Sequence, residues 1–274
     1  MRIAHLIHPA AVSPDRDLFK AQPITFASMV AAAAFARDHG AAGVELLAVQ
    51  MAGEEELSLP PEFRRLPPLQ RSVDDYQPVQ EPRRLALAAD LFEALGRGAG
   101  AAEWGIYTNV DIGVQPHFYS TVAALIAQGF DAFAINRRTI SAGFESAADL
   151  PLMYAEPGAP HPGWDCFVFP VALIARFRLG AVCVGAAGFG RSVLANLAVL
   201  GKRFHVFEDL HATFHLGNEQ IWKEERFQDY ARHNHQECLR ILESFESSRG
   251  TSSPESWLGR LLRQARHAVG SRGG

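Results

Sequence analysis

Apolar runs of strand length alternate with longer segments of helical spacing along the first half of the chain. This pattern predicts strands over residues 2–8, 43–50, 104–112 and 131–138, and helices over residues 26–39, 83–96 and 116–130. Thr25 is expected to cap the first helix and Gly40 to end it. Strands that alternate with helices predict an α/β fold with a central, mostly parallel mixed sheet flanked by helices. Such sheets bind ligands at the carboxyl ends of their strands.

Other parts of the chain interrupt this alternation. Residues 54–82 are rich in proline and charge and are expected to run over the surface, and residues 139–163 are expected to be irregular. Residues 181–209 predict a strand, a glycine-rich turn, a helix and a further strand. Residues 225–246 have the spacing of an amphipathic helix.

The length of 274 residues suits one large domain or two small ones, and an apolar content of 48% supplies a sizeable core. We expect a single domain over residues 1–246, a flexible linker over 247–254 and a basic amphipathic tail over 255–274. Leucines lie on one side of the tail, with Arg260, Arg263 and Arg266 interleaved. The tail would suit peripheral contact with an anionic membrane surface or a partner protein. A plain packed or disordered tail is an equal alternative.

Composition narrows the partners and the compartment. Lys and Arg number 26 against 30 Asp and Glu, a net charge of −4, which gives no support for binding to nucleic acid. The cysteines Cys166, Cys183 and Cys238 lack metal-ligand spacing and are expected to be reduced core thiols, as in a cytoplasmic protein. The N-terminus does not resemble a signal peptide, and we expect no membrane-spanning run of about 18 apolar residues. Cytoplasmic localisation follows, with the inner membrane surface as a peripheral site.

The sequence Thr-Asn-Val-Asp places Asn109 and Asp111 where a predicted strand ends. A carboxylate beside an amide suits a hard divalent cation, which prefers oxygen ligands. Mg²⁺ or Mn²⁺ held there would neutralise a diphosphate as it becomes a leaving group. The alternative is that Asp111 caps a turn or the helix that follows it.

Two later segments carry further candidates. In His161-Pro-Gly-Trp-Asp165, Asp165 is placed to act as a general base, and Trp164 to form a wall for a sugar ring. A turn aspartate satisfied by backbone N–H groups is the alternative. In His-Ala-Thr-Phe-His, His211 and His215 share a face of an extended segment, and one of them would ligate a metal. A purely structural histidine pair is the alternative.

Two arginine pairs suit anionic or hydroxyl-bearing ligands. Arg137 and Arg138 come at the end of a predicted strand, where a guanidinium recognises phosphate or sugar hydroxyls. Arg83 and Arg84 open a predicted helix and suit the same role. Salt bridges on a solvated face are the commoner explanation for such pairs.

A second enzyme class is suggested by the turn Gly185-x-x-Gly188-x-Gly190. It follows an apolar run, precedes a helix, and is followed by Glu208-Asp209 after the next strand, as in NAD(P)-dependent oxidoreductases. The spacing is not G-x-G-x-x-G, and the remaining chain does not continue the strand–helix alternation. NAD(P) binding is therefore the weaker hypothesis.

Three stretches together resemble the GT-A-fold glycosyltransferases, including bacterial members: IYTNVDIGVQPHFYSTVAALIAQGFDAFAINRRTI, HPGWDCFVF and ATFHLGNEQIW. The resemblance spans residues 2–245 in element order, but only the short motifs are specific. It implies a metal-dependent transfer of sugar from a UDP- or GDP-sugar donor to the hydroxyl of a carbohydrate or other acceptor, with Mn²⁺ or Mg²⁺ as cofactor.

The resemblance also implies roles for single residues. Asn109 and Asp111 match the Asp-x-Asp motif, Asp165 the acceptor-side carboxylate and His215 the late histidine. The implied metal ligands are Asp111, Asn109 and His215, with Asp165 and Asp111 as the catalytic pair. The implied donor-binding residues are His8, Pro9, Gln22, Thr25, Arg84, Asn109, Arg137 and Arg138, and the implied acceptor site contains Trp164 and His161. Asn109 replaces an acid and removes one charge from the metal site, so a non-catalytic nucleotide-sugar-binding module is a further alternative.

Overall fold

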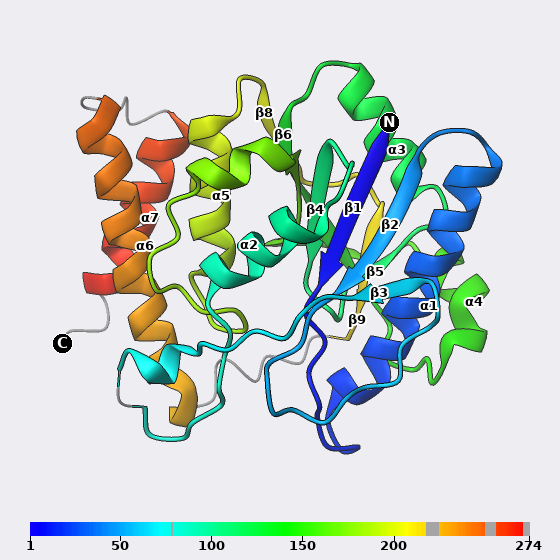
Figure 1. Cartoon of the computed structure of the whole chain (residues 1–274), viewed down its shortest axis with the longest axis horizontal. Coiled ribbons are helices and arrows are strands. Elements are labelled where there is room, and N and C mark those ends of the chain that lie inside the picture. The colour runs from blue at the N-terminus through cyan, green and yellow to red at the C-terminus, as the bar shows by residue number, and fades with distance from the viewer. Residues whose placement is uncertain (78, 218–224, 250–255, 271–274) are drawn as a thin grey trace.

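A computed structural model describes residues 1–77, 79–217, 225–249 and 256–270 of the chain. A mixed sheet forms its centre, in the order β3-β2-β1-β4-β7-β6-β9-β5, and β8 also pairs with β6 (Figure 1). The strands are β1 Arg2–Ile7, β2 Gly43–Ala48, β3 Phe63–Arg65, β4 Trp104–Thr108, β5 Gly113–Val114, β6 Ala132–Ile140, β7 Ala159–Pro170, β8 Phe204–Phe207 and β9 Thr213–Leu216.

Parallel pairing joins β3, β2, β1 and β4, and β6 pairs in parallel with β8 and β9. Strand β7 is antiparallel to both of its neighbours, β4 and β6. The carboxyl ends of β1, β4 and β6 therefore lie at the same edge of the sheet. The predicted fold class, a mostly parallel mixed sheet flanked by helices, is confirmed.

Helices cover both faces of this sheet (Figure 1). They are α1 Asp17–Asp38, α2 Ala88–Gly98, α3 Phe118–Ala127, α4 Leu150–Ala155, α5 Phe189–Leu200, α6 Gln228–Arg249 and α7 Trp257–Gly270. Apolar side chains of α1 and α3 share one core cluster with β1, β4 and β6, and those of α2, α5, α6 and α7 form a second cluster on the other face. Alternate residues of the central strands enter opposite clusters, as the period of two requires.

Helix α1 begins well before the predicted start. It runs from Asp17 to Asp38 and contains Pro23, so Thr25, 1% exposed, lies inside the helix and does not cap it. Gly40, with φ of 65°, follows its end as expected. By length and composition alone α1 qualifies as a membrane span, contrary to the expectation from the sequence. Its buried residues, among them Phe26 and Met29, pack against the sheet as in a core helix.

Three other predictions differ from the structure. The surface excursion contains β3, which pairs in parallel with β2 at the edge of the sheet. The segment predicted to be irregular contains α4, and β7 begins at Ala159. The apolar run at 181–185 is not a strand, because only Cys183 makes a bridge, to Leu87, and the Asn234 side chain takes up its backbone groups. Residues 86 and 88 hydrogen-bond to Val184 and Val182 on either side of this bridge, and the Asn234 side chain satisfies the backbone of Cys183 itself.

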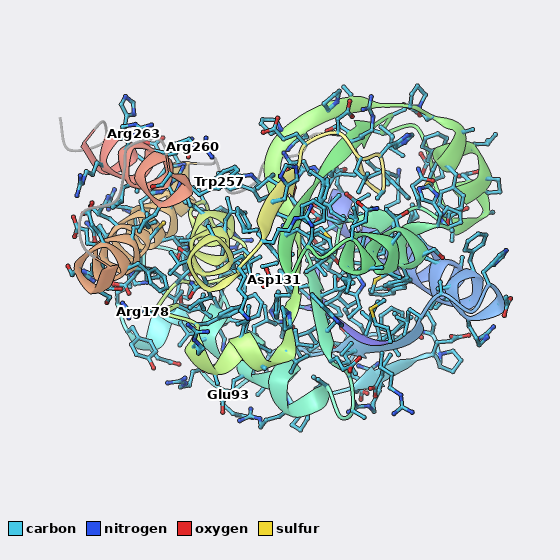
Figure 2. The ribbon with its side chains drawn as sticks, turned by 90° about the horizontal axis from the view of Figure 1, so that it is seen from above. Glu93, Asp131, Arg178, Trp257, Arg260 and Arg263 are labelled. Carbon is cyan, nitrogen blue, oxygen red and sulfur yellow. The ribbon has the colours of Figure 1, made fainter. Side chains whose placement is uncertain are left out.

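The C-terminal segment packs on the domain. Leu258, Leu261 and Leu262 are buried beside α5 and α6, so the apolar side of the predicted tail belongs to the core. Arg260 and Arg263 lie on the outer side of α7 (Figure 2). Helix α6 continues through Arg249, so residues 247–249 of the predicted linker are helical, and residues 250–254 lie outside the described residues.

Candidate active site

The loop after β4 brings Asn109 and Asp111 to the carboxyl edge of the sheet. Val110 and Ile112 are buried, and the alternation turns the two polar side chains away from that core. The backbone N–H of Asn109 donates to the carbonyl of Asp165 at 3.2 Å, which extends the β4–β7 pairing by one bond. The predicted placement of both residues at a strand end is confirmed in the structure.

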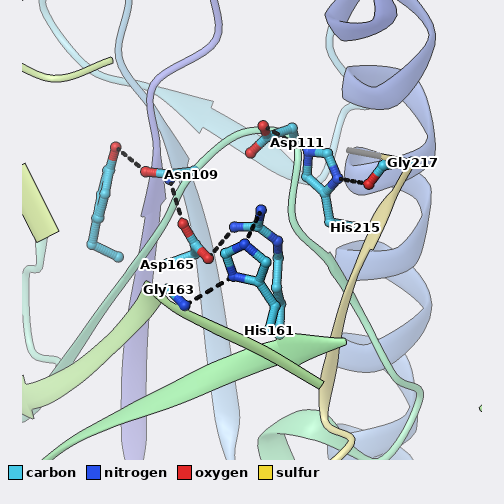
Figure 3. Close-up of polar contacts among 9 residues, drawn as sticks. Asn109, Asp111, His161, Gly163, Asp165, His215 and Gly217 are labelled. Carbon is cyan, nitrogen blue, oxygen red and sulfur yellow. Dashed lines mark hydrogen bonds and ion pairs between the residues drawn. The ribbon is translucent and has the colours of Figure 1, made fainter. Parts of the chain in front are cut away.

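Asn109 turns toward Asp165 and away from Asp111 (Figure 3). Its Nδ2 donates to Oδ1 of Asp165 at 3.1 Å, and its Oδ1 accepts the hydroxyl of Tyr107 at 3.3 Å. Burial raises the pKa of the Tyr107 hydroxyl, and the charges of Asp111 and Asp165 raise it further, so this group stays a donor. Both ends of the amide are thus engaged with Tyr107 and Asp165, and the predicted role of Asn109 as a metal ligand with Asp111 stays a prediction.

Asp165 forms a buried ion pair with Arg137, whose guanidinium NH1 donates to Oδ2. The two side chains are 12% and 11% exposed. A bulge in β7 directs Asp165 there: Ile135 lies opposite Cys166 and Asn136 opposite Trp164, which leaves Asp165 as the extra residue. Bulges of this kind redirect side chains beside functional sites.

His161 completes this group. Its Nδ1 accepts the backbone N–H of Gly163 at 2.9 Å, and its Nε2 lies 3.4 Å from NH2 of Arg137. A side chain on Gly163 would collide with the ring, because a Cβ there would lie 2.6 Å from it. The absence of a side chain at Gly163 therefore leaves room for the ring of His161 within β7.

Asp111 faces His215 of β9. Nε2 of His215 lies 3.1 Å from Oδ2 of Asp111, and Nδ1 donates to the carbonyl of Gly217 at 3.0 Å. With Nδ1 protonated, a neutral ring presents a lone pair to the carboxylate, so this contact requires either a second proton or a cation. Oδ1 of Asp111 is buried without a hydrogen-bond partner among the described residues.

The charges of neighbouring groups shift the pKa values of both His215 and Asp111. Burial lowers the pKa of His215, but the hydrogen bond and negative charge of Asp111 outweigh it, so the pKa lies above its ordinary value. Burial raises the pKa of Asp111, but His215 and Arg137 outweigh it, so the pKa lies below its ordinary value. Both shifts favour an ion pair between the Asp111 carboxylate and a protonated His215 imidazole.

The loop after β1 approaches the site from the side of β2. Nδ1 of His8 pairs with the carbonyl of Val49 at 2.7 Å. The side-chain amide of Gln22 accepts from the N–H of Ala10 at 2.9 Å and donates to its carbonyl at 3.0 Å. Gln22 therefore holds this loop in place, and its amide is not free for the predicted contact with a nucleotide. Pro9 and Thr25 are buried and shape the same region.

The remaining predicted arginines have partners of their own. Arg138 points to the opposite side of β6 from Arg137, where it pairs with Asp209 and donates to the carbonyls of Pro157 and Gly158. Arg84 is exposed, has φ of 49° and donates its N–H to Asp74. It also lies near Glu54, because its charge lowers the pKa of that carboxyl against the effect of burial. The predicted donor contacts of Arg138 and Arg84 stay predictions.

His211 and Trp164 also differ from the expected arrangement. His211 lies 3.3 Å from the side chain of Gln115 and does not join His215 at Asp111. Trp164 is half-buried and packs on the core cluster that includes α5. Its predicted role as a wall for a sugar ring stays a prediction.

Two polar groups near this edge escaped the sequence analysis. Glu54, just past β2, has a buried Oε2 without a partner among the described residues, and burial raises its pKa. His5 is fully buried between the hydroxyls of Tyr119, at 2.8 Å, and Thr108, at 2.9 Å, and burial lowers its pKa to about 3. In the sequence, His5 could have been recognised as the polar residue within the apolar run of the first predicted strand.

The glycine-rich turn has a packing role. Gly188 has φ of 100° and would place a Cβ 3.1 Å from the backbone of Asn234, and Gly190 would place one 2.8 Å from the carbonyl of Trp164. These glycines let α5 approach α6 and β7 closely. No strand precedes the turn and Asp209 pairs with Arg138, so the local strand–turn–helix arrangement behind the NAD(P)-binding alternative is absent here.

No protein-family model matches this chain, and no curated protein matches it in sequence. Its fold is similar to that of two crystal structures of S. aureus TarS residues 1–349. The complex with UDP gives a TM-score of 0.53 at 9% identity, over 100% of this chain and 73% of TarS 1–349. The second structure of TarS 1–349 gives a TM-score of 0.50 at 11% identity over the same shares. The chain therefore has a GT-A-like glycosyltransferase fold.

Proposed function

We propose that this protein is a metal-dependent glycosyltransferase that moves a sugar from a nucleotide-diphosphate donor to an acceptor hydroxyl. The arrangement of Asp111, His215, Arg137 and Asp165 carries the proposal, because it combines a cation-binding pair with a buried carboxylate at the carboxyl edge of the sheet. The GT-A-like fold supports the same conclusion, since TarS, which shares it, was crystallised with UDP.

Asp111 and His215 would hold the metal, Mn²⁺ or Mg²⁺. The unpartnered Oδ1 of Asp111 and the Nε2 of His215 that faces its carboxylate fit a divalent cation. The bound cation would neutralise charge that develops on the departing diphosphate. The described residues contain no cluster of three His, Cys, Asp or Glu that could hold a metal, so donor oxygens would complete the coordination.

The donor would lie along the carboxyl ends of β1, β2 and β4. The loop held by His8 and Gln22 and the carboxylate of Glu54 would border the nucleoside of a UDP- or GDP-sugar. Arg137 would sit beside the diphosphate, because its charge already acts on both Asp111 and His215. A fixed guanidinium there would stabilise negative charge in the transition state.

Asp165 would be the general base. Its carboxylate would take the proton of the acceptor hydroxyl as the acceptor oxygen bonds to the anomeric carbon. The bond between that carbon and the diphosphate oxygen breaks in the same step, and the diphosphate leaves with the electron pair. An inverting outcome follows, with His161 and Trp164 at the acceptor side.

The test compares Asp111→Ala with the wild type by isothermal titration with UDP and Mn²⁺. We expect metal-dependent UDP binding to be lost in Asp111→Ala and kept in Asp38→Ala, a matched change on the exposed end of α1. Unchanged metal-dependent binding in Asp111→Ala would remove the central claim. A thermal-shift screen of nucleotides and nucleotide sugars, with and without Mn²⁺, would identify the donor. Binding without any transfer would favour the non-catalytic module.

A further inference from the structure

We propose that Asn109 is a positioning residue for Asp165, and that this site requires an amide at position 109 where the Asp-x-Asp motif has an acid. The proposal rests on the function proposed above. It changes the meaning of the substitution, because Asn109 then contributes a hydrogen-bond donor to Asp165 and is not a weakened metal ligand.

Three contacts fix Asn109 in this role. Its backbone N–H donates to the carbonyl of Asp165, and its Nδ2 donates to Oδ1 of Asp165 at 3.1 Å. The hydroxyl of Tyr107, itself 1% exposed, donates to Oδ1 of Asn109. Because a hydroxyl that donates must face the amide oxygen, Tyr107 determines which way the amide turns.

The two carboxylate oxygens of Asp165 therefore have separate donors. Asn109, directly after β4, donates to Oδ1, and Arg137 on β6 donates to Oδ2. With a donor on each oxygen, the carboxylate has a fixed plane between the two strands. Catalytic groups must be held within about 0.5 Å of the productive geometry, and two hydrogen bonds from rigid strands supply that restraint.

An aspartate at position 109 would reverse this contact. It has no donor for Oδ1 of Asp165, and it would bring a second carboxylate to the place of an Nδ2 that lies 3.1 Å from the first. Two carboxylates at that separation repel one another. Oδ1 of residue 109 would still accept from Tyr107, so the damage would fall on the side that faces Asp165.

The variant Asn109→Asp distinguishes a metal ligand from a positioning residue, because the two roles predict changes of opposite direction in kcat. If Asn109 is a metal ligand, the added charge should tighten Mn²⁺-dependent UDP binding and raise activity. If Asn109 positions Asp165, UDP affinity with Mn²⁺ should change less than about threefold, while kcat falls on the order of 10²-fold through misplacement of the base. Tighter binding together with a higher kcat would overturn the proposal.

Two further variants test the contact itself. Tyr107→Phe removes only the hydroxyl that orients the amide, and we expect a lower kcat with an unchanged KM for the donor. Asn196→Asp is the matched control, because Asn196 on α5 also donates a buried amide, to the carbonyls of Arg178 and Ser192, outside the site. It should lower the midpoint of unfolding and leave kcat of the folded enzyme unchanged. A kcat in Tyr107→Phe equal to that of the wild type would overturn the inference that Tyr107 orients the Asn109 amide toward Asp165.

The exchange Asn109→Asp with Asp165→Asn gives a result that needs no enzyme assay. It restores one amide and one carboxylate with their positions reversed, so we expect the double variant to lose less in its thermal midpoint than the sum of the single variants. The exchange should not restore kcat, because the carboxylate has moved. If the losses in thermal midpoint of the two single variants simply add in the double variant, the inferred contact between residues 109 and 165 is wrong. Failure of UDP to bind the wild type would reject the proposed function while leaving this thermal result to decide on the contact.

Discussion

The ion pair between Arg137 and Asp165 provides a direct test of how the candidate base is held. Replacement of Arg137 by methionine keeps an unbranched side chain and removes the charge. Asp165 then keeps the Asn109 amide but has no opposing charge, with only 12% of its side chain exposed. Breaking a buried pair by removal of one partner costs about 3–5 kcal/mol, because the remaining charge stays buried.

This loss should be visible in thermal unfolding. For domains of about 150–250 residues, 1 kcal/mol lowers the midpoint by about 2–4 °C, so Arg137→Met should lower it by roughly 6–20 °C at pH 7. Circular dichroism of the wild type, Arg137→Met, Asp165→Asn and the double variant gives the coupling between the two sites. We expect the double variant to lose clearly less than the sum of the two single changes.

An arginine in an exposed ion pair is the control. Arg97 on α2 pairs with Glu93, and the two side chains are 68% and 59% exposed, so this ion pair is solvated and worth about 1 kcal/mol or less. Arg97→Met should therefore cost less than Arg137→Met. Equal losses for the two variants, or a loss below about 1 kcal/mol for Arg137→Met, would refute the inference that Asp165 is held by a buried charge.

Three other outcomes follow from the structure. In metal-free protein the pair of His215 and Asp111 should stabilise the fold below pH ~6.5, the ordinary pKa of histidine. This stabilisation should be lost as pH rises through the raised pKa of His215. It should also be lost on strong acidification, as pH falls through the lowered pKa of Asp111. Urea titrations of the wild type and His215→Gln should thus differ most near pH ~5–6, and a constant difference up to pH ~9 would contradict this. Gly113→Ala places a Cβ 2.3 Å from the ring of Phe214, and overpacking should cost about 1–3 kcal/mol in denaturant unfolding, whereas a neutral result would mean that the ring moves freely. Leu261→Ala should cost about 2–5 kcal/mol, because this side chain is 1% exposed in the core, and a cost near zero would make α7 a detachable tail.

The sequence was sufficient for the central architecture, since apolar spacing reports the period of each element. Strands β1, β2, β4 and β6 and the helices between them occur in the predicted order, although α1 begins earlier and α2 later than predicted. The pattern failed where tertiary contacts replaced local signals. Helix α1 starts before Pro23, β3 pairs with the edge offered by β2, and the run around Cys183 makes a single bridge, to Leu87, while Asn234 bonds the backbone of Cys183.

The candidate site divides in the same way. The sequence by itself determined that Asp111, Asp165 and His215 stand at strand ends or in an extended segment, because residue type and spacing are local properties. Only the tertiary structure decided their partners, which come from strands up to 104 residues apart in the chain. It also decided that Arg137 enters the site while Arg138 leaves it, since a bulge between β6 and β7 sets the direction of each side chain. The sequence showed both Asn109 and Asp165, but only the tertiary structure showed that the amide donates to this carboxylate, because the two residues come from different parts of the chain.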